Sequence, residues 1–143
     1  MRTGLLAAMF AGMTAFAVSA GEKDKQPAKP PMPDVTGAWQ GTWGPVEKVA
    51  GKEVPPMKLD CSVVRKGDNW EATFEGECGR PYKYTIKMNG RQVGPVVMFK
   101  GTVDLGEKDG GVYDWIGRAN DKDFVGFYTS AKYTGTFHLS RAK

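Results

Sequence analysis

The chain has 143 residues, the size of one domain, with 20 Lys and Arg against 16 Asp and Glu and a net charge of +4 at pH 7. The basic residues are scattered among acidic ones, which is typical of a solvated surface and excludes a dense nucleic-acid-binding patch. Two cysteines and a single histidine leave few side chains for a metal site or for nucleophilic catalysis.

Residues 1–20 have the features of a secretory signal peptide. Arg2 supplies a positive start, Gly4 to Val18 is uncharged, and Val18-Ser19-Ala20 places small residues where a signal peptidase cuts. The uncharged run is shorter than the roughly 20 apolar residues that a membrane-spanning helix needs. We therefore predict a secreted or periplasmic protein with no membrane span after cleavage, with an uncleaved anchor as the alternative.

Residues 21–34 follow as a segment rich in lysine and proline, without apolar periodicity. Such a composition is typical of a disordered or polyproline-like linker. The folded domain is therefore predicted to cover residues 35–143. Its first strand is expected at residues 35–43, and a long loop at residues 44–56 follows, with valines that can fold over one end of the domain.

The first strand carries two tryptophans separated by glycines. On strand spacing, Gly37, Trp39, Gly41 and Trp43 point to one face, where the two indoles form a wide aromatic surface. Other strands of the domain are expected to pack against this surface.

Further strands follow at short, regular spacing, each with alternating apolar and polar residues. Asn89-Gly90 is the strongest hairpin-turn signal in the chain. Gly94-Pro95 predicts a bulge or an edge kink in the strand after that turn. The predicted strands after the first are 57–65, 70–77, 82–88, 93–103, 112–118, 124–129 and 133–141.

This series of eight strands joined by hairpins favours an all-β fold, a single closed up-and-down antiparallel β-barrel without exposed sheet edges. Gly37-Ala38-Trp39 in the first strand and Arg141 at the end of the last resemble the calycin pattern of lipocalins, avidins and fatty-acid-binding proteins. In that superfamily a G-x-W strand closes against the last strand. The resemblance implies an eight-stranded calycin-like barrel in which Trp39 and Arg141 form a structural clasp through a cation–π contact.

Cys61 and Cys78 are predicted to form a disulfide, because an exported domain of this size gains stability from a cross-link. Ideal hairpin geometry opposes the bond. If Arg65 pairs with Trp70, Cys61 lies opposite Phe74, and Cys78 lies roughly 13 Å further along the strand. A bulge or a curl of the chain near Cys78 is then needed to bring the two Cβ atoms to about 4 Å.

His138 is the single histidine. Gly37-Ala38-Trp39-Gln40-Gly41 and His138-Leu139 resemble parts of the nitrobindin-like haem proteins, which implies an axial ligand facing the barrel interior. Strand alternation instead places His138 opposite Phe137 and Leu139, and hence outside the barrel. We therefore expect no cofactor and no metal, and without a second histidine or an inward pair of carboxylates we expect no enzyme.

Aromatic residues dominate the predicted interior. An eight-stranded barrel has room for its own side chains or for one small ligand, so two hypotheses follow. In the first, a non-enzymatic barrel binds a small apolar ligand or an extracytoplasmic protein partner, with Trp39, Trp43, Tyr84 and Trp115 lining the site. In the alternative, a filled core supports a structural or interaction module, such as an envelope protein or an enzyme inhibitor, that acts through the 44–56 loop. The aromatic residues predicted to point inward are Trp39, Trp43, Trp70, Phe74, Tyr82, Tyr84, Phe99, Trp115, Phe124, Tyr128, Tyr133 and Phe137.

Overall fold

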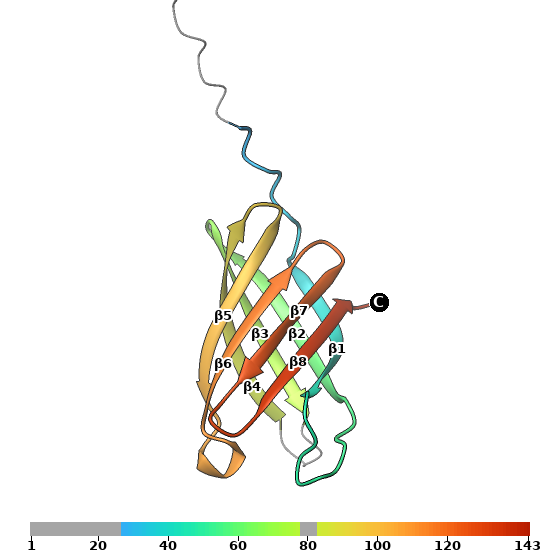
Figure 1. The fold of residues 1–143 in the computed structure, drawn as a ribbon. Coiled ribbons are helices and arrows are strands. Elements are labelled where there is room, and N and C mark those ends of the chain that lie inside the picture. The colour runs from blue at the N-terminus through green and yellow to red at the C-terminus, as the bar shows by residue number, and fades with distance from the viewer. Residues whose placement is uncertain (1–26, 78–82) are drawn as a thin grey trace, which may run out of the picture.

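The structure is a computed structural model that describes residues 27–77 and 83–143, so the predicted signal peptide, Cys78 and Tyr82 lie outside the described residues. The described strands form one closed antiparallel barrel in which each strand pairs with its sequence neighbours and β1 pairs with β8 (Figure 1). This confirms the predicted up-and-down β-barrel. The elements are β1 (Gly37–Pro45), β2 (Met57–Lys66), β3 (Asn69–Glu77), β4 (Lys83–Val93), β5 (Val96–Asp104), the 3₁₀ turn η1 (Glu107–Asp109), β6 (Val112–Ala119), β7 (Asp123–Thr129) and β8 (Thr134–Arg141).

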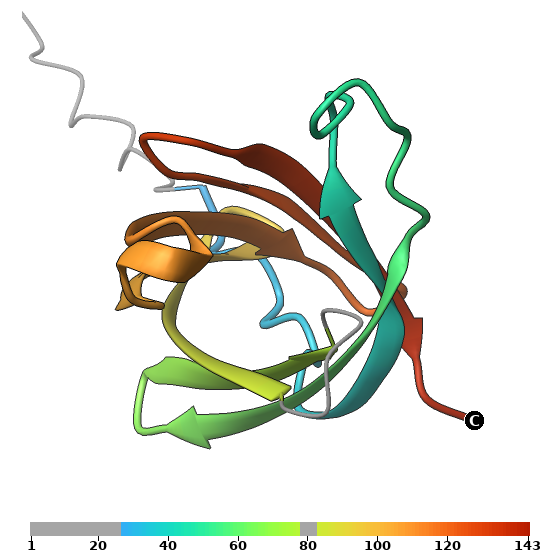
Figure 2. The ribbon, with the colours of Figure 1, turned by 90° about the horizontal axis from the view of Figure 1, so that it is seen from below.

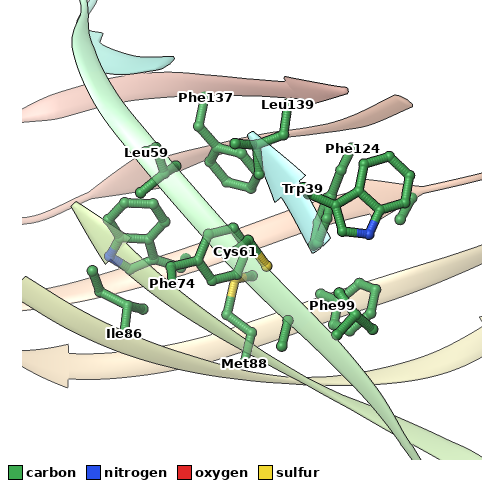
Figure 3. Close-up of a cluster of buried hydrophobic side chains, with 14 of the residues drawn as sticks. Trp39, Leu59, Cys61, Phe74, Ile86, Met88, Phe99, Phe124, Phe137 and Leu139 are labelled. Atoms are coloured by element: carbon green, nitrogen blue, oxygen red, sulfur yellow. The ribbon is translucent and has the colours of Figure 1, made fainter. Parts of the chain in front are cut away.

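Strand alternation builds the core. In β3 and β6 every second residue is buried and the residues between are exposed or half-buried, as the sequence pattern predicts. Phe74 lies near the middle of the barrel, with its ring centroid 5.3 Å from that of Phe124 and 5.5 Å from that of Phe137 (Figure 3). No charged or polar residue is buried among the described residues. The middle of the barrel is therefore filled by packed rings.

The predicted hairpin turn at Asn89-Gly90 is wrong. Strand β4 continues through this pair, and the chain turns at Gly94-Pro95, where a bulge was predicted. Gly94 has a φ of +60°, which a glycine adopts without strain. Gly90 instead faces the interior, where an added Cβ would lie 2.5 Å from the ring of Phe99. The glycine at position 90 is therefore required by close packing inside the barrel and not by a turn.

The predicted register between β2 and β3 is confirmed, since Cys61 lies opposite Phe74 and Arg65 lies opposite Trp70. Cys61 points into the core, is 5% exposed and is free among the described residues. Because Cys78 lies outside the described residues, the disulfide between the two remains a prediction.

The chain before β1 covers one end of the barrel. Residues 27–36 contain no helix or strand, and Figure 2 shows them crossing the end that lies far from the viewer. The Gln92 side-chain amide donates to the carbonyl of Pro30 at 3.3 Å, which holds this segment beside the β4–β5 hairpin. Val35 is fully buried, and its carbonyl accepts a hydrogen bond from Trp39 Nε1 at 3.0 Å. In the described part of the chain, no helix is long and apolar enough to cross a membrane.

Candidate functional site

Trp39 lies at the covered end of the barrel. Its ring is completely buried, and Arg141, its neighbour across the β1–β8 seam, places Cζ 4.3 Å from the ring centroid. The same guanidinium donates to the backbone carbonyls of Thr36 and Asp34. Arg141 thus joins the last strand, the first strand and the segment before it, so Trp39 belongs to the closed end and has no access to solvent.

Trp43 lies at the opposite end, near the last residue of β1. A cavity of about 250 Å³ opens here, between the 46–56 loop and η1, which lie on either side of this end in Figure 2. We call it the mouth cavity. Its walls are mostly aromatic and aliphatic, with one lysine and one aspartate. The lining residues are Trp43, Pro45, Val49, Val54, Met57, Tyr84, Lys108, Asp109, Tyr113, Tyr128 and Tyr133.

The Trp43 indole is hydrogen-bonded and packed on several sides. Its Nε1 donates to the carbonyl of Glu77 at 3.0 Å, and its ring lies over Gly76, where an added Cβ would be 3.2 Å from the indole. The ring centroid of Tyr128 lies 5.4 Å from that of Trp43, and Tyr84 approaches edge-on at 6.4 Å. A binding surface that is already ordered loses less conformational entropy when a ligand arrives.

Two tyrosines supply polar groups at the mouth cavity. The Tyr113 hydroxyl donates to the carbonyl of Asp109 at 2.8 Å. Burial raises the pKa of Tyr128, and burial is also the main cause that raises the pKa of Tyr113. Both phenols therefore stay protonated near neutral pH and offer neutral hydroxyl groups. Gly135 makes room for Tyr128, since an added Cβ there would lie 2.1 Å from the phenol oxygen.

The four predicted lining residues separate into three positions. Trp43 and Tyr84 line the mouth cavity. Trp115 lies beneath it, stacked on Tyr128 with ring centroids 4.8 Å apart, and its buried Nε1 has no hydrogen-bond partner. Trp39 lies at the other end of the barrel, against Phe124 and not against Trp43.

Several cavity residues escaped the sequence-based list, namely Met57, Tyr113, Tyr128 and Tyr133. The predicted topology could have identified some of them, because an up-and-down barrel brings the ends of odd-numbered strands and the starts of even-numbered strands to the same end of the barrel. Tyr128 lies near the end of β7, and Tyr113 near the start of β6. Tyr133, predicted to be inward, precedes β8 and is 38% exposed at the rim.

His138 points away from the interior, as strand alternation predicted, and its side chain is 67% exposed. Its Nε2 lies 3.4 Å from Asp123 Oδ1 on the outer surface. An axial haem ligand must face the cavity, so the resemblance to haem-binding barrels does not extend to this residue. Among the described residues, no group of three His, Cys, Asp or Glu side chains is placed to hold a metal ion.

Comparisons with known proteins assign neither a family nor a function to the chain. No protein-family model matches the chain, and no curated protein matches it in sequence. Among solved structures, the chain is similar to a crystal structure of a mutant of the fluorescent protein UnaG. The identity is 12% and the TM-score is 0.42, over 76% of this chain and 96% of that chain. This similarity is too distant to carry a function, so the site is assigned from its own geometry.

Proposed function

We propose that the protein is an exported, non-enzymatic β-barrel that binds a small apolar ligand, one or two rings in size, in the mouth cavity. The observation that carries the proposal is the ordered aromatic cavity of about 250 Å³ around Trp43. Small-molecule sites are concave and mostly apolar, with a few polar groups that orient the ligand. An engineered apolar cavity of about 150 Å³ holds benzene, whereas drug-sized ligands occupy roughly 300–1,000 Å³. The mouth cavity therefore suits a ligand between these sizes.

The polar groups favour binding over catalysis. Tyr113 and Tyr128 are held in the protonated form by burial, so they are suited to hydrogen bonding and poorly suited to general-base catalysis. Lys108 and Asp109 lie at the rim, where they can orient a polar substituent. Export is the remaining part of the proposal, and it is supported by the charge and hydropathy pattern of residues 1–20.

A second candidate function is an interaction module without a ligand. It is supported by the filled interior, in which rings from most strands pack together, and by the surface of the 46–56 loop. Val46 in that loop is 58% exposed, and it is the apolar side chain that a partner bound to the loop would cover. In this case the loop binds the partner and the aromatic cavity only supports the loop.

Native mass spectrometry of protein purified from its own host separates the two functions. Val54→Trp fills the mouth cavity from the loop, and Val46→Trp adds the same side chain at an exposed position of the same loop that does not line the cavity. We expect a reproducible adduct on the wild type and on Val46→Trp, and a bare mass for Val54→Trp. A bare wild-type mass supports the interaction module, and an adduct of equal abundance on all three proteins rejects the mouth cavity as the site.

A further inference from the structure

The outer surface of the barrel carries a second and larger concave feature. It has a volume of about 590 Å³ and lies over β3, β4, β5 and β6, beside the end of β2. We call it the outer groove, and its charged and partly exposed apolar lining residues include Lys66, Glu71, Arg91, Met98, Lys100 and Ile116. None of its lining residues lines the mouth cavity, so the two sites can bind independently.

Strand register places cations beside apolar side chains in the outer groove. Arg91 on β4 lies directly opposite Met98 on β5, and Lys100 on β5 lies directly opposite Ile116 on β6. Residues directly opposite each other in an antiparallel pair have Cβ atoms about 5 Å apart. Each cation therefore lies next to an apolar side chain, and one bound molecule can contact both. Ile116 is 41% exposed, and its own partner on β7, Phe127, is 47% exposed, which extends the apolar surface.

The charge of the outer groove is unbalanced. Lys66, Arg91 and Lys100 form no ion pair with a described residue, and Glu71 is the single carboxylate of the lining. Isolated lysines are ordinary on a protein surface, and so are isolated exposed apolar residues. Here both kinds of residue share one concave surface, which favours a ligand that carries an acid group and an apolar part.

We propose that the outer groove binds a single anionic amphiphile, whose acid group contacts Arg91 and Lys100 and whose apolar part covers Met98 and Ile116. The concave shape favours one molecule over a bilayer, which is flat. An extended peptide is disfavoured because the barrel is closed, and its strands have no free edge that could pair with a peptide backbone. Arg91 and Lys100 occupy diagonal positions on β4 and β5, so both can form charge-assisted hydrogen bonds with one carboxylate.

The test is NMR spectroscopy of the ¹⁵N-labelled protein titrated with decanoate, and separately with 1-decanol as the neutral probe of the same chain length. We expect decanoate to shift the amide signals of residues 89–91, 98–100 and 116. The double variant Arg91→Gln/Lys100→Gln should weaken decanoate binding at least tenfold, while 1-decanol binding changes less. Both residues are exposed, so the variant is expected to fold, and its amide spectrum checks this directly.

The control variant Lys122→Gln/Lys143→Gln removes the same charge from exposed positions outside the outer groove, and it should bind decanoate as the wild type does. The proposal is overturned if decanoate leaves the groove signals unchanged, or if both double variants lose the same affinity. It is also overturned if decanoate shifts only mouth-cavity signals. Binding to phosphatidylglycerol vesicles in the absence of monomer binding would show that the surface recognises a membrane instead.

Discussion

Replacing Arg141 with alanine tests how much this side chain adds to the stability of the β1–β8 seam. Its guanidinium lies 4.3 Å from the Trp39 ring centroid and donates to the carbonyls of Thr36 and Asp34. Alanine removes the cation from the ring and leaves both carbonyls to solvent. The segment before β1 also loses its attachment to the last strand, so Val35 is expected to leave its buried position more often.

The magnitude follows from the contacts. A cation–π contact contributes about 0.5–2 kcal/mol, depending on how far it is desolvated. A hydrogen bond from a charged donor contributes about 1.5–3 kcal/mol. We count the lower value for the part-buried bond to Thr36, because the Arg141 side chain is 33% exposed, and little for the bond to Asp34, which is exposed to solvent. The ion pair with Asp34 adds little, since that carboxylate is 79% exposed. We therefore expect the free energy of unfolding to fall by about 2–4 kcal/mol, which corresponds to a Tm roughly 10 °C lower.

Urea unfolding followed by tryptophan fluorescence measures this loss. Arg118→Ala is the matched control, because Arg118 is exposed on β6 and its removal should cost less than about 0.5 kcal/mol. Arg141→Lys keeps the charge but lacks the planar fork that reaches two carbonyls, so its stability should be intermediate. If Arg141→Ala loses no more stability than Arg118→Ala, the contacts of Arg141 with Trp39, Thr36 and Asp34 do not contribute to the free energy of unfolding.

Three further predictions concern Gly90, Tyr128 and the pair Cys61 and Cys78. Gly90→Ala places a Cβ 2.5 Å from the Phe99 ring and should cost about 1–3 kcal/mol in urea unfolding; a cost near zero would contradict the packing role of this glycine. Burial raises the pKa of Tyr128, so the folded protein keeps a proton that the unfolded chain releases above about pH 10, and stability should fall as pH rises through that range. Tyr128→Phe should flatten this slope by up to about 1.4 kcal/mol per pH unit, and equal slopes in urea titrations would reject it. A disulfide between Cys61 and Cys78 makes the intact mass about 2 Da lower before reduction than after it, and an unchanged mass rules it out.

Most of the fold could be predicted from the alternation of apolar and polar residues along each strand. The positions of Trp70, Phe74 and Trp115 inside the barrel follow from period-two spacing, because one face of each strand is buried and the other is solvated. The register of Cys61 opposite Phe74 followed from locating a short turn between β2 and β3. These features depend on neighbouring residues in the chain, so the sequence alone was sufficient to predict them.

Features that depend on distant residues could not be predicted in the same way. Asn89-Gly90 is a strong local turn signal, but the glycine is needed where β4 packs against Phe99, and that tertiary contact outweighs the local preference. The misplaced turn also hid the outer groove, since Arg91 and Met98 become neighbours only when the chain turns at Gly94.

The difference between the two ends of the barrel also depends on residues that are distant in the sequence. Trp39 and Trp43 share one face of β1, and their spacing alone does not separate them as lining residues. The sequence separated them only through the clasp that the calycin resemblance implies for Trp39 and through the 44–56 loop that follows Trp43. They differ because residues 27–36 cover the Trp39 end, where Val35 is buried, whereas the Trp43 end opens between two loops. Which end is covered depends on the path of a segment without periodicity, and such a path has no signature in the sequence.

The central claim, that a ligand occupies the mouth cavity, is tested most directly by comparing two ¹⁵N-edited NMR spectra. One is recorded on protein purified folded from its own host, and the other on the same sample after it has been unfolded, freed of small molecules and refolded. We expect signals of residues around the mouth cavity, including the Trp43 indole N–H, to differ between the spectra while those of the Trp39 end coincide. Identical spectra, or differences confined to regions away from Trp43, would contradict the claim.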